Sequence, residues 1–330
     1  MKLVTFSVAG AAPCLGVQQG DRVVAVRPQL LARGDPRRAW LSDMLGLMRA
    51  GDEALRILAD AVPRLLRDGA DVFALDAVTL HPPFLPTTVL CAGSNYAAHN
   101  KEKAAAPLSG KEPEFFLKTA DCVTGPDTPI LFDARLTRKL DCETELAVVI
   151  GKPGRHIPVA SALDHVFGYS IVNDVTARDL QVRRRPDGVT WYELGRGKVF
   201  DTSAPFGPCL VTADEIAQPQ GLTIRTRING ELRQLGNTRD MIWSCAELIH
   251  HFSTSLTLKP GVVIITGTPA GTAWSTDEEL GGRWSPVHDG LETVVPATRY
   301  CLPGDRIESE IEGIGVLRNI IADAAGRAGA

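Results

Sequence analysis

From about residue 87 onward, the chain alternates short apolar runs with turns rich in glycine and proline, and this pattern limits the folds that it can adopt. The runs are TVLCAG, ELAVVIG, VFGYSIVND, GPCLVT, LTIRTRING, VVIITG and RIESEIEGIGVLRN. Few of them are separated by the long helical patterns that a doubly wound parallel sheet requires. The pattern therefore predicts an α+β protein rich in β-structure, with a mostly antiparallel or mixed sheet.

Two stretches of this region have the spacing of apolar residues that is typical of a helix. The first covers about 95–103, with Asn95 as a candidate N-cap. The second covers about 238–254, TRDMIWSCAELIHHFST, with Thr238 or Asp240 as the cap. Both assignments rest on a capping residue placed directly before the periodic pattern.

The first eighty residues have a different pattern, which predicts a small α+β domain of its own. MKLVTFSVAG and CLGVQQGDRVVAV alternate apolar and polar residues, with Gly-Asp at a turn, as in a hairpin. A helical pattern follows over about 38–68. Three prolines in HPPFLP then mark a boundary. We therefore expect a small domain over 1–80 and a larger domain over 87–325.

Composition argues against several classes of partner. The formal net charge of −4 gives no excess of basic residues, so no nucleic-acid partner is expected. No segment holds 18 uninterrupted apolar residues, so no membrane span is expected, and the N-terminal MKLVTFSVAG resembles a strand more than a signal peptide. Seven scattered cysteines without a C-x-x-C pair predict reduced thiols in a cytoplasmic protein.

Two glutamates open the run ETELAVVIG. Glu143 and Glu145 are two residues apart, so on a strand they point to the same side. Two such charges usually face water at the edge of a sheet. Here the residues that follow are all apolar, as in a strand that is buried on both faces. A divalent cation would neutralise both buried charges, and carboxylate oxygens suit Mg²⁺, Mn²⁺ or Ca²⁺.

A third carboxylate ends the apolar run VFGYSIVND. Asp174 stands where the side chains of neighbouring strands often converge on a site, and VTARDLQ directly after it supplies Arg178 and Gln181. By pattern alone, the more common role of such an aspartate is to cap the turn or helix that follows it.

The stretch NYAAHNKE places His99 and Glu102 three residues apart, on one face of a helix. A carboxylate beside an imidazole orients it and raises its basicity, which is the usual arrangement of a general base. The alternative is an ordinary surface pair.

Lys198 lies among glycines in ELGRGKVFD, where it is suited to hold a carboxylate or an enolate, or else is a solvated loop residue. Thr268 of TGTPAG either donates a hydrogen bond or shapes its turn. Neither stretch has the spacing of a nucleotide-binding glycine motif.

Taken together, eight stretches from about 88 to 322 resemble the fumarylacetoacetate hydrolase (FAH) superfamily, and they occur in the order of that family. They are AGSNYAAHNKE, PEFFLKTADCVTGPDTPI, ETELAVVIG, GYSIVNDVTARDLQ, GKVFDTSAPFGP, INGELRQLGNTRDMIW, ITGTPAG and PGDRIESEIEGIGVLRN. The resemblance implies a roll of mixed β-sheets, with the N-terminal eighty residues as the small extra domain of longer members, and normally a homodimer.

The resemblance also implies roles for particular residues. Glu143, Glu145 and Asp174 would ligate a divalent metal, usually Mg²⁺ or Mn²⁺. His99 and Glu102 would form a water-activating dyad. Four further residues would contact the substrate or stabilise an oxyanion: Arg178, Gln181, Lys198 and Thr268.

Two segments depart from the family pattern. The polar stretch 274–292, WSTDEELGGRWSPVHDGLE, is longer than the expected link between TGTPAG and the PGD strand, and it looks like a long surface loop that reshapes the entrance to the site. VRRRPDGVTWYE (182–193) carries three consecutive arginines, suited to an anionic or bulky substrate.

From this resemblance we expect a metal-dependent hydrolase that cleaves a carbon–carbon bond in a β-diketo acid, such as an acylpyruvate or a fumarylacetoacetate-like compound, in aromatic catabolism. The substrate partner would be a small 2-oxo acid. The alternative is an isomerase or decarboxylase acting on a 2-oxo or 2-hydroxydienoate ring-fission product such as 2-hydroxyhepta-2,4-diene-1,7-dioate. A non-catalytic ligand-binding relative fits less well, because every catalytic position is filled, and a nucleotide-dependent oxidoreductase lacks its glycine motif.

Overall fold

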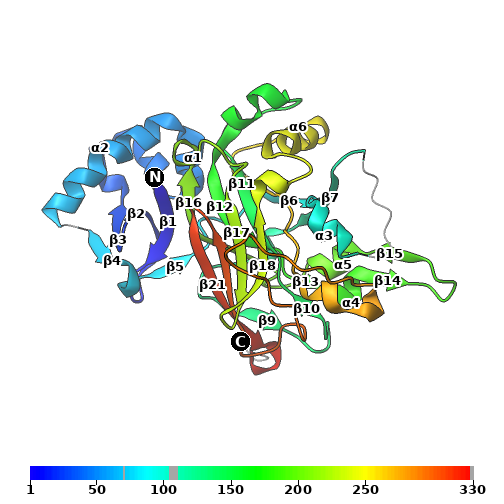
Figure 1. The fold of residues 1–330 in the computed structure, drawn as a ribbon. Coiled ribbons are helices and arrows are strands. Elements are labelled where there is room, and N and C mark those ends of the chain that lie inside the picture. The colour runs from blue at the N-terminus through cyan, green and yellow to red at the C-terminus, as the bar shows by residue number, and fades with distance from the viewer. Residues whose placement is uncertain (70, 104–110, 328–330) are drawn as a thin grey trace.

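The fold is built around a large mixed sheet (Figure 1). The computed structural model describes residues 1–69, 71–103 and 111–327. Within these residues the sheet has twelve strands, ten of them in the order β4-β3-β2-β1-β16-β12-β11-β19-β6-β7. β5 pairs with β1, and β8 pairs with β16.

In sheet order, the strands are β4 (Val72–Ala74), β3 (Arg22–Val26), β2 (Cys14–Gln19), β1 (Lys2–Ser7), β16 (Ala204–Thr212), β12 (Val166–Asn173), β11 (Thr144–Ile150), β19 (Val262–Ile265), β6 (Thr88–Gly93) and β7 (Glu114–Lys118), with β5 (Thr79–His81) and β8 (Val123–Thr124) off this path. Most neighbours are antiparallel, whereas β19 and β6 are parallel.

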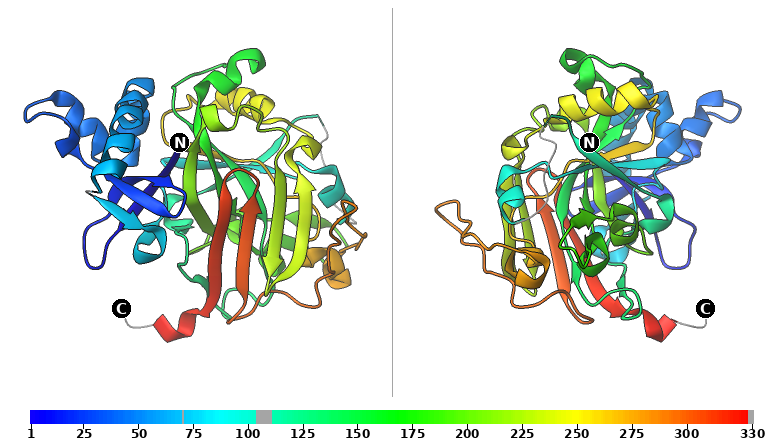
Figure 2. Two further views of the ribbon diagram at one scale, coloured as in Figure 1. Left: turned by 60° about the vertical axis from the view of Figure 1, so that its left-hand side comes forward. Right: turned by 90° about the vertical axis from the view of Figure 1, so that its right-hand side faces the viewer.

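A second sheet of five strands lies beside the first one (Figure 2). Its strands are β18 (Glu231–Asn237), β17 (Thr223–Ile228), β20 (Arg306–Ile311), β21 (Gly315–Asp323) and β9 (Ile130–Phe132). Two short pairs complete the strands: β10 (Leu140–Asp141) with β13 (Thr176–Ala177), and β14 (Val182–Arg184) with β15 (Thr190–Tyr192). The predicted α+β fold with mixed sheets is confirmed.

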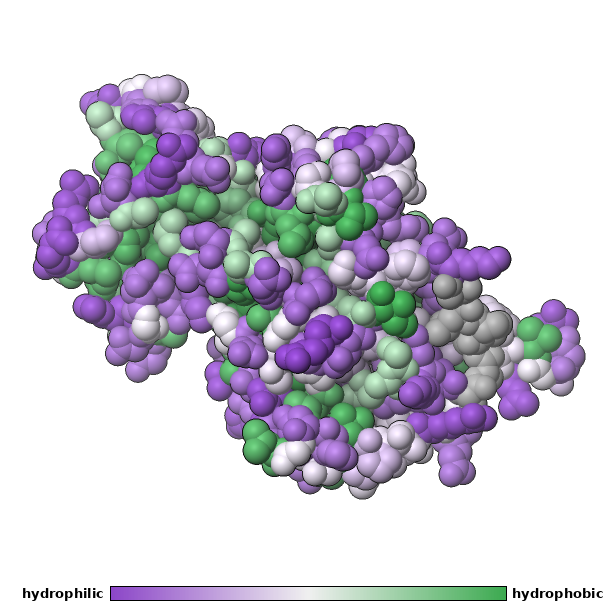
Figure 3. All heavy atoms as spheres, turned by 45° about the horizontal axis from the view of Figure 1, so that its top comes forward, coloured by the Kyte–Doolittle hydropathy of each residue, from purple (hydrophilic) through white to green (hydrophobic). Residues whose placement is uncertain are grey.

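The helices are few and mostly short. They are α1 (Met44–Ala50), α2 (Asp52–Asp68), α3 (Ala97–Lys101), α4 (Arg178–Gln181), α5 (Leu194–Lys198) and α6 (Cys245–Ser255). No helix in the described part of the chain has both the length and the apolar character needed to cross a membrane. Figure 3 shows one face of the molecule, on which hydrophilic side chains predominate and the apolar ones gather mainly in the left half.

Strand β11 lies between two hydrophobic cores. Leu146 and Val148 pack in the core that also contains Ile224 of β17 and Ile311 of β20. The alternate residues, Ala147 and Val149, face the core that includes α1 and α2. Because successive side chains of a strand point to opposite faces, a strand covered on both sides must be apolar throughout. This explains the continuous run LAVVI.

The N-terminal strands extend the central sheet. β2 and β3 form the predicted hairpin around Gly20 and Asp21, and α1 and α2 cover the predicted helical region. β1 then pairs with β16 through Lys2↔Val211 and Leu3↔Leu210. The division of the chain between residues 80 and 87 stays a prediction.

Both predicted helix caps in the larger domain were wrong. α3 begins after Tyr96, and the Asn95 amide instead donates to the carbonyls of Trp243 and Thr266. α6 begins after Ser244, which forms a capping box with Glu247, and residues 238–240 form a separate 3₁₀ turn. Capping residues and turn-forming residues are of the same types, so a local pattern does not separate them.

We expect the Ser244→Ala substitution to lower the free energy of unfolding by about 1 kcal/mol, because it leaves the Glu247 backbone N–H without its cap. Urea unfolding of the purified protein measures this difference. Ser255→Ala, at the exposed C-terminal end of the same helix, serves as the control and should change stability much less. Equal losses in the two variants would contradict the capping assignment.

Candidate metal centre and active site

Three carboxylates from the centre of the large sheet meet in one buried cluster. Glu143 directly precedes β11, Glu145 lies within β11, and Asp174 directly follows β12. β11 and β12 pair antiparallel with Thr144 opposite Asn173, so the start of one strand adjoins the end of the other. The three residues each offer an oxygen within 4.8 Å of the others, and no more than 3% of any of them is exposed.

The chemistry of this cluster suits a divalent cation. Burial, together with the neighbouring Asp174 and Glu143, raises the pKa of Glu145 well above its usual range. Lys118 Nζ lies 2.9 Å from Asp174 Oδ1, but the two groups are not aligned for a hydrogen bond, so that buried oxygen has no hydrogen-bond donor among the described residues. Crowded carboxylate oxygens of this kind are the ligands of hard ions such as Mg²⁺ and Mn²⁺. The three predicted ligands therefore fit a metal site.

Buried cations surround the carboxylate cluster. Lys198, the last residue of α5, donates to Glu143 Oε2 and Asp174 Oδ2, both at 2.6 Å. Burial alone lowers the pKa of Lys198, but Asp174 and Glu143 outweigh it and raise that pKa above its usual value. The Arg178 guanidinium donates to Glu143, to Gln181 Oε1 at 2.9 Å and to Asp141 Oδ2 at 2.9 Å. The structure thus brings the predicted Lys198, Arg178 and Gln181 to the cluster.

His99 and Glu102 form a buried pair beside the cluster. His99 Nδ1 lies 2.7 Å from Glu102 Oε2, and His99 Nε2 lies 3.9 Å from Glu143 Oε1. Burial lowers the pKa of His99 well below its usual value and raises the pKa of Glu102 to about 8. The imidazole is therefore neutral at pH 7. When Glu102 is ionised, as it becomes when the pH rises through about 8, His99 donates its Nδ1 proton to Glu102. The Nε2 lone pair then faces the cluster, as a general base requires.

Thr268 lines the pocket that also contains His99 and the three carboxylates, but its hydroxyl already makes hydrogen bonds within the protein. Thr268 Oγ1 donates to the Thr144 carbonyl at 3.0 Å and accepts from the Gln234 amide at 2.8 Å. A hydroxyl has one proton to donate. In this structure Thr268 therefore fixes the turn of TGTPAG and offers no spare donor to an oxyanion.

The groups that hold Arg178 and Glu102 in place were not predicted from the sequence. Asp141 accepts from Arg178 and from the backbone of Ala273 and Trp274, the two backbone contacts each at 3.1 Å. The Gly271 N–H donates to Glu102 Oε1 at 2.6 Å. Asp141 adjoins the ETE motif and was open to detection as a further buried acid. The Gly271 contact is made by the backbone, which leaves no signal in the side-chain pattern.

The prediction that 274–292 forms a long surface loop was wrong for its first part. Trp274 is only 1% exposed. Its ring lies 5.1 Å from Arg178 Cζ and 5.6 Å from Lys103 Nζ, and the Tyr192 ring stands on it nearly edge-on. An aromatic face attracts cations, which explains why this residue turns inward. Further along, the Arg283 N–H donates to the Glu102 carbonyl at 3.0 Å, so the segment covers the end of α3.

The three consecutive arginines lie on the β14–β15 hairpin, which projects at the right of Figure 1. Arg183 approaches Glu193 at 3.8 Å, and Arg185 pairs with Asp187 at 2.8 Å. Neither is among the residues that line the pocket with His99. A contact between these arginines and the substrate stays a prediction.

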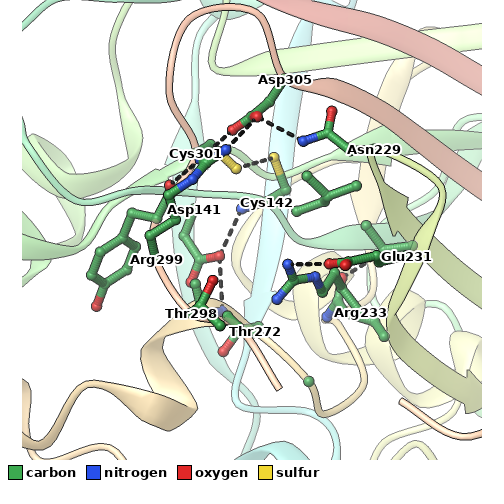
Figure 4. Close-up of a pocket in the computed structure, with 17 residues that line it drawn as sticks. Asp141, Cys142, Asn229, Glu231, Arg233, Thr272, Thr298, Arg299, Cys301 and Asp305 are labelled. Carbon is green, nitrogen blue, oxygen red and sulfur yellow. Dashed lines mark hydrogen bonds and ion pairs between the residues drawn. The ribbon is translucent and has the colours of Figure 1, made fainter. Parts of the chain in front are cut away.

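A further pocket, distinct from the one that contains His99, is lined in part by Asp141 and has a volume of about 240 Å³ (Figure 4). Figure 4 shows the Cys142 and Cys301 sulfurs facing one another, and they are 3.8 Å apart. Arg299 pairs with Asp305 at 2.6 Å on one wall. Asp141 lines this pocket and also accepts from Arg178, which donates to Glu143 of the carboxylate cluster.

Comparison with known proteins identifies the family. Residues 88–322 match the family model described as "Fumarylacetoacetate (FAA) hydrolase C-terminal". The chain belongs to the fumarylacetoacetate hydrolase family. It is 39% identical to the oxaloacetate tautomerase YisK of Bacillus subtilis over 255 residues, which are 77% of this chain and 76% of that protein. It is also 39% identical to the mitochondrial oxaloacetate tautomerase FAHD2A of Homo sapiens over 266 residues, 81% of this chain and 74% of that one.

Solved structures of the fumarylacetoacetate hydrolase family share the fold. The fumarylacetoacetate hydrolase of Exiguobacterium antarcticum superposes with a TM-score of 0.74 at 35% identity and covers 98% of this chain and 99% of its own. The maleylpyruvate hydrolase of Sphingobium sp. SYK-6, in complex with manganese(II) and pyruvate, superposes with a TM-score of 0.69 at 27% identity, covering 98% and 99%. Metal binding is therefore a property found in this family.

These comparisons correct the expected activity. Both relatives named above are tautomerases, and a tautomerase is an isomerase. The expectation of a hydrolase that cleaves carbon–carbon bonds was wrong, and the place in aromatic catabolism that was inferred with it loses its basis. The findings favour the isomerase named as the alternative. The same buried base and carboxylate cluster serve proton transfer as readily as the activation of water, so the site residues did not separate the two reactions.

Proposed function

We propose that this protein is a metal-dependent keto–enol tautomerase of a small 2-oxo acid of the oxaloacetate class. The observation that carries the proposal is the neutral His99 imidazole, which is oriented by Glu102 and places Nε2 3.9 Å from a carboxylate of the candidate metal centre. The names of the two tautomerase relatives support the choice of reaction.

Tautomerisation moves one proton between the carbon next to a carbonyl and the carbonyl oxygen. A divalent cation, Mg²⁺ or Mn²⁺, held by Glu143, Glu145 and Asp174 would polarise the 2-oxo group and stabilise negative charge on its oxygen. In the keto-to-enol direction, His99 Nε2 takes the proton from carbon 3 of the substrate. Glu102 stabilises the imidazolium that forms, and His99 then returns the proton to the oxygen.

The remaining residues position the reacting groups. Lys198 and Arg178 hold Glu143 from two sides, which keeps the carboxylate cluster in place. The Gly271 N–H donates to the side chain of Glu102, and the Arg283 N–H donates to its backbone carbonyl. These two contacts hold the His99–Glu102 pair beside the carboxylate cluster. Tautomerisation consumes no water, so the reaction needs no attacking nucleophile.

A coupled assay tests the proposal. Enol oxaloacetate is mixed with enzyme and Mg²⁺ or Mn²⁺, and the loss of its ultraviolet absorbance is followed while pyruvate formation is measured in parallel. We expect ketonisation well above the spontaneous rate, no matching release of pyruvate, and loss of the acceleration on chelation. A rate equal to the spontaneous one with both metals would refute the proposal, and stoichiometric pyruvate would identify a decarboxylase.

The Gly271→Ala substitution should lower this activity and the stability of the protein. Gly271 has φ +109°, and a Cβ there would lie 1.9 Å from the Arg233 carbonyl oxygen. The backbone must shift, and with it the N–H that holds Glu102, while the strained φ alone costs about 1–3 kcal/mol. Gly290→Ala is the control, because Gly290 has φ +90° and no atom lies within 4 Å of the position that its Cβ would take. Gly290→Ala should keep full activity, and an equal loss in both variants would contradict the role of Gly271.

The cellular setting belongs to the proposal as well. We propose a cytoplasmic homodimer whose partner is the small-molecule substrate alone, without nucleic acid or membrane. The free cysteines support a reducing compartment. Light scattering of the purified protein measures the assembly.

A further inference from the structure

Among the residues that the structure describes, one cation in the active-site pocket has no acidic partner. Lys198, Arg178 and Lys118 each pair with a carboxylate of the cluster or beside it. Lys103 lines the same pocket as His99, and among the described residues no carboxylate lies within ion-pair distance of its ammonium. Its Nζ donates to Ser94 Oγ at 3.0 Å and lies 5.6 Å from the centroid of the Trp274 ring.

We propose that Lys103 determines specificity by binding the second carboxylate of a dicarboxylic 2-oxo acid. The inference rests on the proposed function, in which the 2-oxo acid end of the substrate faces Glu143, Glu145 and Asp174. It adds a residue that recognises the opposite end, and it narrows the substrate class to short dicarboxylates.

The chemistry of the substrate requires a cation beside the base. In a compound of the oxaloacetate type, carbon 3, from which His99 takes its proton, carries the second carboxylate directly. A group that recognises this carboxylate must therefore lie close to the imidazole. Lys103 follows His99 by four residues and lies two residues beyond the end of α3. Both side chains line one pocket.

The surroundings of Lys103 favour an anionic ligand. Burial lowers the pKa of the Lys103 amine to about 8, because a buried ammonium without a counter-charge is unfavourable. A bound carboxylate would supply that charge. The hydroxyl of Ser94 and the ring of Trp274 orient the amine without neutralising it. Glu114 also lines the pocket, but it forms no ion pair with Lys103.

The backbone around Lys103 keeps the amine in place. Lys103 forms a β-bridge with Gly282, and the neighbouring Arg283 N–H donates to the Glu102 carbonyl at 3.0 Å. The segment 274–292 thus contacts the backbone of Glu102 and Lys103, the two residues that directly follow α3. This contact gives the long insertion a role in positioning the specificity residue.

The test compares two ligands that differ only in the second carboxylate. Binding of oxaloacetate and of pyruvate to the Mg²⁺-loaded protein is measured by calorimetry for the wild type and for Lys103→Met, which has a similar length and no charge. We expect the dissociation constant of oxaloacetate to rise about tenfold to a hundredfold, as the loss of a charged hydrogen bond implies, and that of pyruvate to change less than twofold. Lys103→Arg should restore part of the preference.

Controls separate this role from a structural one. Lys101→Met removes an exposed lysine at the end of α3, two residues before Lys103, and should change neither constant. Equal weakening of both ligands in Lys103→Met, or wild-type protein that binds pyruvate as tightly as oxaloacetate, would overturn the proposal. The oxaloacetate solution is used at tautomeric equilibrium, so binding is measured without net conversion. A protein that prefers oxaloacetate but does not tautomerise it would therefore refute the proposed function and leave the role of Lys103 standing.

Discussion

His99→Ala is expected to lower the turnover number for enol oxaloacetate by about 10²–10⁴-fold, the range typical of a lost general base. Of the two ring nitrogens of His99, Nδ1 contacts Glu102, and Nε2 faces the carboxylate cluster at 3.9 Å from Glu143 Oε1. No other neutral base among the described residues lines the pocket at that point. Stopped-flow measurement of ketonisation at saturating substrate and metal gives the effect directly.

The metal content provides the control for His99→Ala. Because His99 is not one of the three clustered carboxylate residues, the variant should bind Mn²⁺ as the wild type does. Glu102→Gln should keep the imidazole but weaken its orientation, and so reduce turnover less. A His99→Ala variant that retained wild-type turnover would remove the base from the mechanism.

Glu145→Gln is expected to weaken Mn²⁺ binding by at least ~100-fold and to abolish activity at moderate metal concentration. Glu145 is 2% exposed, and its Oε2 accepts from the Gly267 N–H at 2.6 Å, so the amide can occupy the same place without the charge. One of three ligands is then lost while the packing is kept. Isothermal titration with Mn²⁺ on chelator-treated protein measures the change.

Chelator-treated protein gives a second readout of the same site. A ligand that binds only the folded state stabilises that state, so Mn²⁺ should raise the melting temperature of the wild type and have little effect on Glu145→Gln. Glu279→Gln, with a side chain 80% exposed, is the matched control and should behave as the wild type. A Glu145→Gln variant that still binds Mn²⁺ tightly would contradict the assignment of the cluster.

The carboxylate cluster was predictable because strand geometry converts spacing into position. Glu143 and Glu145 share a side because the period of a strand is two, and Asp174 joins them because β12 runs antiparallel to β11. The place of Asp174 in this cluster could not be derived from spacing alone. It came from the resemblance to the family, which also supplied the role of Arg178.

Other parts of the site were not predictable, for physical reasons. The Gly271 N–H that holds Glu102 belongs to the backbone, and every residue except proline has one. Trp274 opens a segment that is polar on average, so its burial against Arg178 was hidden by its neighbours. The choice between hydrolysis and tautomerisation depends on which atom the base meets, and that is a property of the bound substrate more than of the residue types.

The pairing of β1 with β16 has a consequence for anyone who shortens this protein. A truncated version that starts at the family-matched segment, at residue 88, would strip Leu210 and Val211 of their cover, although both are at most 1% exposed in the intact chain. An exposed edge strand of this kind can pair with strands of other chains and so promotes aggregation. The exposed strand would be β16, which pairs with β12, and β12 leads to Asp174. Aggregation of the shortened protein would therefore also disturb the end of the sheet that carries the carboxylate cluster.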